Sequence, residues 1–180
     1  GESTLAALNT PPQERLQAVV VALERLRWMG DAPRGSRHIW VNQPDFTARI
    51  VDDGRVTFQT RAVIGKNVPD QRTPEFSDVM EYMVINPSWG VPRSIIVKEY
   101  LPLLQRNRNA VGHLQVVDGN GRVVPRGAVN FAAYSASSFP FGLRQPPSDG
   151  NALGKVKFMF PNKYNIYLHD TPSKNLFANE

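Results

Sequence analysis

The sequence has 180 residues, 41% of them apolar and 21% charged, which is the composition of a globular domain and excludes a disordered chain. Its 21 lysine and arginine residues exceed its 16 acidic residues, which favours an anionic partner, although the basic residues form no dense run. The lack of cysteine excludes disulfides, thiolate metal sites and a cysteine nucleophile from these residues, and no apolar run is long enough to cross a bilayer.

A helix is predicted near the start of the chain. Thr10 is placed to cap it, Pro11 suits its first turn and Gln13 can complete a capping box. Gly30 is a plausible stop. Between these residues, an apolar stripe recurs at helical spacing, formed by Leu16, Val19, Val20, Leu23 and Leu26. This helix either packs on the domain that follows or belongs to a preceding domain, and we favour packing.

From His38 onward the pattern is typical of strands. Apolar and polar residues alternate through residues 46–51 and again through residues 56–60, and Asp52-Asp53-Gly54 between them is a strong turn sequence. These features predict a hairpin or meander. Residues 79–85 are a further strand candidate, which Asn86-Pro87 closes.

The middle of the chain differs in character. A helix is predicted from Pro92 to Tyr100, and Pro102 should break or kink it. Residues 106–145 are rich in polar and turn residues, and valine pairs on either side of a glycine-rich turn at 118–121 predict a small hairpin. We interpret this region as an insertion on the main sheet and not as a second domain.

The last part of the chain returns to strands. Residues 156–160 alternate, residues 161–163 form a turn, and residues 164–169 form the next strand. The histidines His38, His113 and His169 lie far apart and show no metal-ligand spacing, so we expect no metal and no cofactor. Basic and aromatic residues do not interleave as they do on nucleic-acid-binding sheets, so we expect no nucleic-acid partner.

Several separated motifs occur in an order that carries a family resemblance. They are Val41-Asn42-Gln43-Pro44, Gly65-Lys66 followed by Gln71-Arg72-Thr73-Pro74, Asn86-Pro87-Ser88-Trp89, and a C-terminal block from Asn151 to Pro172 that contains Tyr167-Leu168-His169-Asp170-Thr171-Pro172. Together they closely resemble the YkuD-type catalytic domain of bacterial L,D-transpeptidases, in the large Gram-negative form. The resemblance extends from about residue 41 to about residue 177.

The resemblance implies a fold and a domain organisation. It implies a mainly β fold of the α+β class, a sandwich of mixed sheets with peripheral helices and an inserted capping subdomain. Residues 1–36 would form an N-terminal helix and linker, and residues 37–180 would form the transpeptidase-like domain. Within it, residues 92–141 would be the capping insertion, a lid that covers the cleft and keeps water from the reaction.

The resemblance also implies an activity. Such enzymes cross-link peptidoglycan stem peptides: a cysteine thiolate attacks the third residue of a donor tetrapeptide, the terminal D-alanine leaves, and a diaminopimelate amine takes the acyl group, which makes a 3-3 cross-link. Carbapenems acylate the family's cysteine. The implied location is the periplasm or cell envelope, and no membrane span is expected in this chain.

The family's functional residues fall on defined positions of this sequence. By resemblance, His169 is the catalytic base, and Tyr167 contacts substrate from the same strand face. Asp170 and Thr171 follow as in the family's signature and are grouped with the substrate-binding residues, although we expect their side chains to fix the turn rather than perform chemistry. Further candidates for substrate binding are Arg144, Asn151 and Gly154. For Arg144 a structural ion pair is an equal alternative, and Gly154 would permit a positive φ or a close backbone approach.

One departure from the family pattern decides what these residues can do alone. The family's nucleophile lies in a Ser-x-Gly-Cys motif after the histidine, and these 180 residues contain no cysteine. We therefore expect a chain truncated before the nucleophile and inactive by itself. The alternative is a non-catalytic envelope module that binds peptidoglycan with the same cleft.

Overall fold

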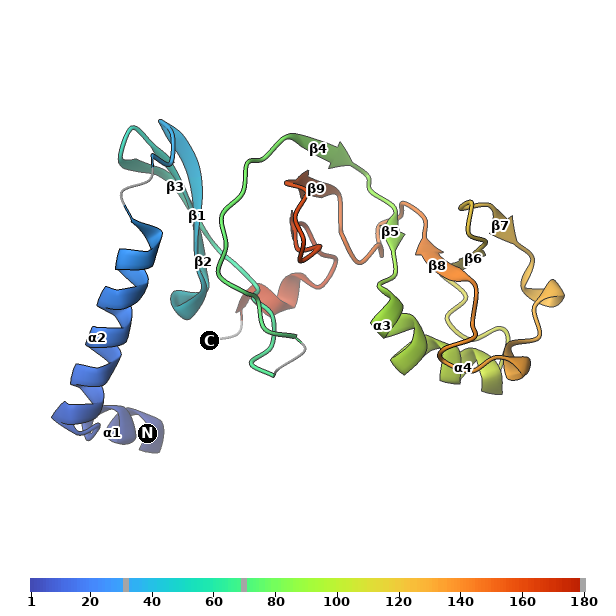
Figure 1. Ribbon diagram of the computed structural model, residues 1–180, viewed down its shortest axis with the longest axis horizontal. Coiled ribbons are helices and arrows are strands. Elements are labelled where there is room, and N and C mark those ends of the chain that lie inside the picture. Colours follow the sequence, from blue (N-terminus) through green and yellow to red (C-terminus); the bar gives the residue numbers. More distant parts are fainter. Residues whose placement is uncertain (31–32, 69–70, 179–180) are drawn as a thin grey trace. The chain divides into compact units, whose positions relative to one another are not determined.

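The computed structural model describes residues 1–30, 33–68 and 71–178. The chain forms two compact units, Gly1–Ala62 and Val63–Glu180, and each is considered by itself (Figure 1). This division falls later in the chain than the expected limit between residues 36 and 37, and that domain limit stays a prediction. None of the described helices is both long and apolar enough to cross a membrane.

The first unit begins with two helices, α1 (Glu2–Leu8) and α2 (Pro12–Met29). The predicted capping of α2 by Thr10 is wrong, because Pro11 is the N-cap and the Thr10 hydroxyl donates 3.4 Å back to the Ala6 carbonyl at the end of α1. The sequence analysis did not predict the short preceding helix, whose carbonyl accepts the hydrogen bond from this hydroxyl. Gly30 ends α2 with a φ of 56°, as predicted. The apolar stripe of α2 is exposed.

An antiparallel meander follows in the same unit. It consists of β1 (Arg37–Asn42), the 3-10 turn η1 (Gln43–Asp45), β2 (Thr47–Asp52) and β3 (Arg55–Arg61), in the order β1-β2-β3. The predicted turn is present: Asp53 and Gly54 both have positive φ, 47° and 78°, which suits the right-handed twist of the flanking strands. The meander predicted from the sequence is therefore confirmed.

The second unit contains two sheets. In one, β9 (Val156–Met159) lies between β4 (Tyr82–Ile85) and β10 (Leu168–His169). In the other, the order is β5 (Trp89–Gly90), β8 (Gly142–Gln145), β6 (Gln115–Val117) and β7 (Val123–Val124). The pairings observed among the described residues are antiparallel, whereas the expectation was mixed sheets. The mainly β fold class is confirmed.

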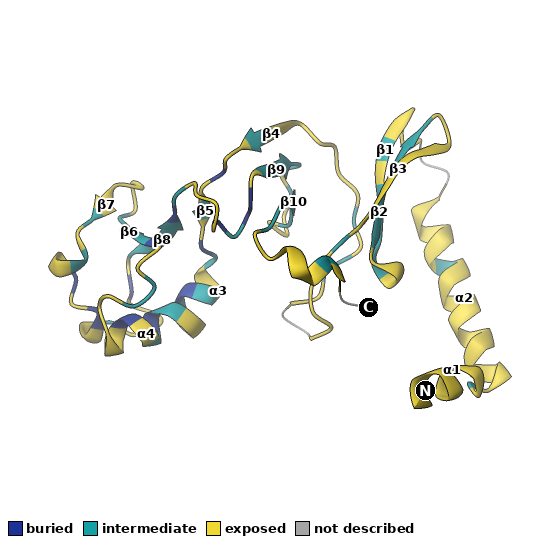
Figure 2. Cartoon of the chain, turned by 180° about the vertical axis from the view of Figure 1, so that it is seen from behind, coloured by how far each residue is buried: buried dark blue, intermediate teal, exposed yellow. Residues whose placement is uncertain are grey.

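The buried apolar core of the described residues lies around the second of these sheets. Helices α3 (Arg93–Ile95) and α4 (Leu101–Arg106) and the 3-10 segments η4 (Arg126–Ala128) and η5 (Phe131–Ala133) pack with it, whereas η6 (Lys174–Ala178) follows β10. Figure 2 shows this concentration of buried residues. The core consists of Val91, Ile96, Leu101, Leu104, Leu114, Val116, Val129, Phe131, Phe139 and Leu143. Eight of these ten residues lie in the predicted insertion, and Val91 and Leu143 flank it on either side.

Of the two predicted effects of Pro102, a break or a kink, the break is absent, because the helical conformation continues past this residue. A π-helical segment, η3 (Ile96–Tyr100), joins α3 to α4, and Pro102 lies in the first turn of α4. A proline inside an ordinary α-helix lacks an amide donor and clashes with the carbonyl four residues earlier. Because the preceding turn is wider, the chain stays helical through the proline. Leu101 and Leu104 are consequently both buried on one side of α4.

Candidate functional site

The hairpin of β9 and β10 carries the predicted catalytic histidine. Its turn is held by Asn162, whose amide donates to the carbonyls of Phe160 at 2.8 Å and Ile166 at 2.7 Å. The same side chain accepts from the amide of Tyr164 at 3.0 Å. This single asparagine closes the turn from both sides, so that β10 returns along β9 with His169 directly opposite Lys157.

The imidazole of His169 is exposed and has one defined partner. Its Nδ1 lies 2.5 Å from the backbone carbonyl oxygen of Asp170. A carbonyl can only accept, so Nδ1 carries the proton in this contact and Nε2 of the neutral ring is an unprotonated acceptor. A histidine held in this tautomer has the arrangement of a general base, with a backbone carbonyl in the orienting position.

Tyr167 and Lys157 lie beside this histidine. Residues directly opposite in an antiparallel pair project to the same face, so Lys157 and His169 share a face of the sheet. Nζ of Lys157 lies 3.8 Å from the centre of the Tyr167 ring, which places the tyrosine on that face too. Partial burial lowers the pKa of Lys157. The face around His169 therefore combines an aromatic ring, a cation and an imidazole.

Asp170 anchors the chain directly after His169. One carboxylate oxygen accepts from the backbone amide of Lys155 at 3.0 Å, and the other accepts from Nζ of Lys174. The hydrogen bond from Lys174, supported by backbone donors, lowers the pKa of Asp170 to about 2. The Thr171 hydroxyl accepts from the amide of Ser173 at 3.2 Å. In this structure the side chains of Asp170 and Thr171 bind their own turn.

Gly154 permits the close contact with Asp170. Its φ is +59°, and a Cβ built at this position would lie 2.4 Å from a carboxylate oxygen of Asp170. Both features expected for this glycine, a positive φ and a close approach, are present. The carboxylate that supports the histidine turn can therefore approach the chain only because residue 154 has no side chain.

Asn151 and Gln145 hold the loop that leads to Gly154. The Asn151 side chain is completely buried; its amide donates to the carbonyls of Gln145 at 3.3 Å and Pro146 at 3.0 Å, and its oxygen accepts from the amide of Leu153 at 2.8 Å. The Gln145 side chain also spans the loop: its amide nitrogen donates to the Gly150 carbonyl at 2.9 Å, and its oxygen accepts from the Ala152 amide at 3.0 Å. This buried polar cluster fixes the loop between β8 and β9.

Arg144 lies in the other sheet of the second unit, on β8. Its guanidinium donates to the side-chain oxygen of Gln115, at 3.0 Å from Nη2, and to the Gly121 carbonyl at 3.3 Å. These partners are an amide oxygen and a backbone carbonyl. The sequence analysis had predicted either a structural ion pair or the binding of a substrate carboxylate. The structure brings Tyr167, His169 and Asp170 together in one hairpin, whereas it gives Arg144 partners in a different sheet.

Two residues of this arrangement were missed by the sequence analysis. Lys157 could have been placed, because strand alternation and an assumed pairing with the histidine strand put it on the same face. Gln145 belongs to a passage that resembles the family, but its role in the loop could not be predicted, because its two partners are defined only once the loop is folded. Among the described residues no group of three histidine, aspartate or glutamate side chains could hold a metal ion.

Comparison with known proteins gives two results. Residues 36–180 match the family model of the L,D-transpeptidase catalytic domain, YkuD. Over 163 residues, the chain is 31% identical to a protein of Haemophilus influenzae that bears the name "Putative L,D-transpeptidase". This alignment covers 89% of the chain and 32% of the relative, so the chain spans about a third of the length of the protein it matches.

Proposed function

The chain belongs to the family of YkuD L,D-transpeptidase catalytic domains, and from this premise we propose that, in the intact protein, it supplies the base of a cysteine acyltransferase that cross-links peptidoglycan stem peptides. The observation that carries the proposal is the contact between Nδ1 of His169 and the Asp170 carbonyl, which leaves Nε2 free to take a proton. The nucleophile of this reaction is a cysteine outside these 180 residues, which contain none.

The proposed reaction has two halves. In the first, Nε2 of His169 takes the thiol proton and the thiolate attacks the carbonyl carbon of the third residue of a donor tetrapeptide. The bond to the terminal D-alanine breaks, the imidazolium returns the proton to the leaving amine, and a thioester remains. In the second, the side-chain amine of diaminopimelate attacks the thioester. His169 takes the amine's proton and returns it to the departing sulfur, so a 3-3 cross-link forms and the thiol is restored.

The other residues take supporting parts in this proposal. Tyr167 and Lys157 form the substrate-facing surface beside the base, with an aromatic ring for packing and a cation for a carboxylate. Asp170, Thr171 and Gly154 position the histidine turn through the contacts described above. For the completely buried Asn151 we propose a positioning role in the loop before Gly154.

Further parts of the proposal concern the whole protein. Residues 92–141 act as a lid that keeps water from the thioester, and the hydrophobic core to which they contribute eight of ten residues supports the idea of a rigid insertion. Residues 37–180 are the transpeptidase domain and residues 1–36 a helix with a linker. The location proposed is the cell envelope, where peptidoglycan stem peptides are available. Arg144 could bind a stem-peptide carboxylate only if its hydrogen bonds to Gln115 and Gly121 were replaced by hydrogen bonds to that carboxylate.

Carbapenem acylation of the intact protein tests the proposal. We expect one drug molecule to add per protein, as measured by intact-mass spectrometry, with the adduct on a cysteine. We expect the Trp89→Phe variant, altered outside the histidine hairpin, to acylate as the wild type does. Binding to purified sacculi without any adduct would overturn the enzymatic proposal and favour a non-catalytic peptidoglycan-binding module.

A further inference from the structure

The positive charge of the chain is concentrated in residues 92–141. These 50 residues hold six lysine and arginine residues against two acidic residues, whereas the remainder of the sequence holds 15 basic and 14 acidic residues. The capping insertion thus accounts for four of the five net positive charges, while the rest of the chain is nearly neutral. A surface with this charge attracts anionic partners and raises their local concentration.

Five of the insertion's six cations divide into two groups by their partners, and the sixth, Lys98, has an interaction of its own. Arg93 and Arg126 donate to backbone carbonyls, for example from Arg93 to Ala136 at 2.9 Å, and these contacts satisfy their donors without cancelling their charge. Within the part of the chain that the structure describes, the guanidinium groups of Arg106, Arg108 and Arg122 have no hydrogen bond or ion pair. They are therefore available to an external anion.

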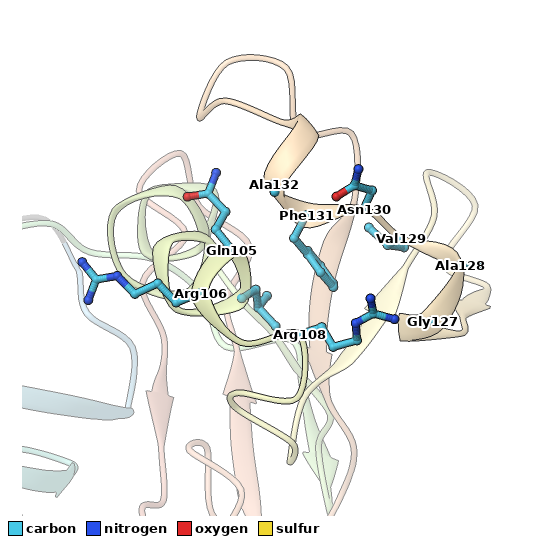
Figure 3. Close-up of a pocket in the computed structure, with 10 residues that line it drawn as sticks. Gln105, Arg106, Arg108, Gly127, Ala128, Val129, Asn130, Phe131 and Ala132 are labelled. Carbon is cyan, nitrogen blue, oxygen red and sulfur yellow. The ribbon is translucent and has the colours of Figure 1, made fainter.

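Two of these available groups, Arg106 and Arg108, line a pocket of about 400 Å³ between α4 and the segments η4 and η5. The buried side chains of Leu104, Val129 and Phe131 line it together with Arg106, Arg108 and Asn130. In the close-up of Figure 3, the Arg108 side chain extends toward Gly127 and Ala128, whereas Arg106 points away on the opposite side. The pocket therefore combines apolar surface with one cation directed along its edge.

The loop that carries Arg108 is fixed before any ligand binds. The guanidinium of Arg126 donates to the carbonyl of Arg108 at 2.9 Å, and to those of Ala110 at 2.7 Å, Val111 at 2.8 Å and Leu114 at 2.5 Å. A planar, permanently charged donor suits such a set of carbonyls. Because the loop is already ordered, the binding of a ligand to Arg108 does not have to offset a loss of conformational entropy in this loop.

We propose that this pocket binds a carboxylate of a peptidoglycan stem peptide, with Arg108 as its ligand, so that the capping insertion holds a strand of the wall as well as covering the cleft. The chemistry fits: stem peptides combine several carboxylates with short aliphatic side chains, and a guanidinium binds a carboxylate through two parallel hydrogen bonds. This inference rests on the proposed function for the choice of peptide, and on the pocket for the binding.

The test uses the intact protein carrying His169→Gln, so that binding is measured without turnover. The probe is a muramidase-released disaccharide tetrapeptide, and its affinity is measured by calorimetry. We expect Arg108→Gln to weaken binding roughly tenfold or more, as expected for the loss of a charge-assisted pair. Arg122→Gln is the matched control, because it removes the same unpaired charge from the same insertion at a residue that does not line the pocket. We expect it to leave the affinity within about twofold.

Binding at Arg108 should also depend on the carboxyl groups of the ligand. The same fragment with its carboxyl groups amidated should bind the parent protein as weakly as the native fragment binds the Arg108→Gln variant. Equal losses of affinity in the Arg108→Gln and Arg122→Gln variants would show that binding depends on a diffuse electrostatic field and would overturn the proposed pocket. Equally tight binding of the amidated fragment, or full displacement of the native fragment by a short DNA strand, would also overturn it. Acylation of the wild-type protein, measured separately, reports on the proposed reaction independently of this pocket.

Discussion

At His169, a single hydrogen bond fixes the tautomer of the imidazole. The Asp170 carbonyl fixes the proton of His169 on Nδ1, and the adjacent Asp170 carboxylate holds the same turn through Lys155 and Lys174. Asp170 thus contacts the imidazole of His169 through its backbone carbonyl and not through its carboxylate. A backbone carbonyl as the orienting group stays neutral at every pH, so the tautomer does not depend on a second titrating side chain.

The carboxylate of Asp170 is expected to stabilise the fold in a pH-dependent way. Its pKa in the folded chain is about 2, below the ordinary value, so its ionised contacts contribute fully above about pH 4 and are lost as the pH falls toward 2. Asp170→Asn should therefore cost about 1 kcal/mol at pH 7, after allowance for screening, and almost nothing near pH 2. Urea denaturation of the two proteins across this range measures the difference.

Asp149 provides the control for this prediction. Its carboxylate pairs with Lys155, which lowers its pKa, but it lies at the surface. We expect Asp149→Asn to show no measurable pH-dependent difference from the wild type, because exposed ion pairs contribute little. A difference between wild type and Asp170→Asn that stays constant from pH 7 to pH 2 would contradict the role assigned to Asp170.

At the scale of elements, the loop between β8 and β9 depends on Gly154. Gly154→Ala forces a side chain into a positive φ and toward the Asp170 carboxylate, so we expect a loss of about 2 kcal/mol or more in the free energy of unfolding. Gly150→Ala is the matched control in the same loop, because a Cβ there meets nothing within 4 Å and its φ is not positive. It should change stability by less than about 0.5 kcal/mol. Equal effects of the two substitutions, in urea denaturation, would refute the close-approach argument.

Local elements were predicted well where a strong turn and regular alternation coincided, and less well at helix ends. Asp53-Gly54 specifies a turn by its own backbone preference, and the alternating residues around it specify strands, so the meander followed from the sequence. The predicted break at Pro102 is absent, because a π-helical turn precedes this proline and the helix continues through it. No short sequence pattern indicates such a turn. Thr10 was also misleading, because a helix on its N-terminal side competes for its hydroxyl.

The site was predictable in part. His169 and Tyr167 came from a family motif. The structure sets both in one hairpin, but the strand there is Leu168–His169, shorter than the predicted 164–169, and Tyr167 directly precedes it. The supports of the site were not predictable, because Gln145 and Asn151 gain their partners only when the loop closes on itself. The contact of Gly154 with Asp170 joins residues 16 positions apart, and the sequence indicated only that the glycine had backbone freedom.

At the scale of the whole molecule, burial is unevenly distributed. The buried apolar residues of the described chain lie between Val91 and Leu153, and the β1–β3 sheet has none. Local stability follows buried apolar contacts, so amides in β6 and β8 should exchange with solvent at least about tenfold more slowly than amides in β2 and β3. Hydrogen-exchange mass spectrometry of this chain measures both. Slower exchange in β2 and β3 would contradict this distribution of stability.

The central claim is that His169 serves as the base of a cysteine acyl transfer in the intact protein, and turnover of a donor tetrapeptide tests it most directly. The account predicts release of D-alanine and formation of a 3-3 linked dimer, both measured by liquid chromatography with mass spectrometry. It predicts a fall of about 10²- to 10⁴-fold in the His169→Gln variant and no change in the His113→Gln variant, whose residue is exposed in the capping insertion. Unchanged turnover in the His169→Gln variant, or no D-alanine release by the wild type, would contradict it.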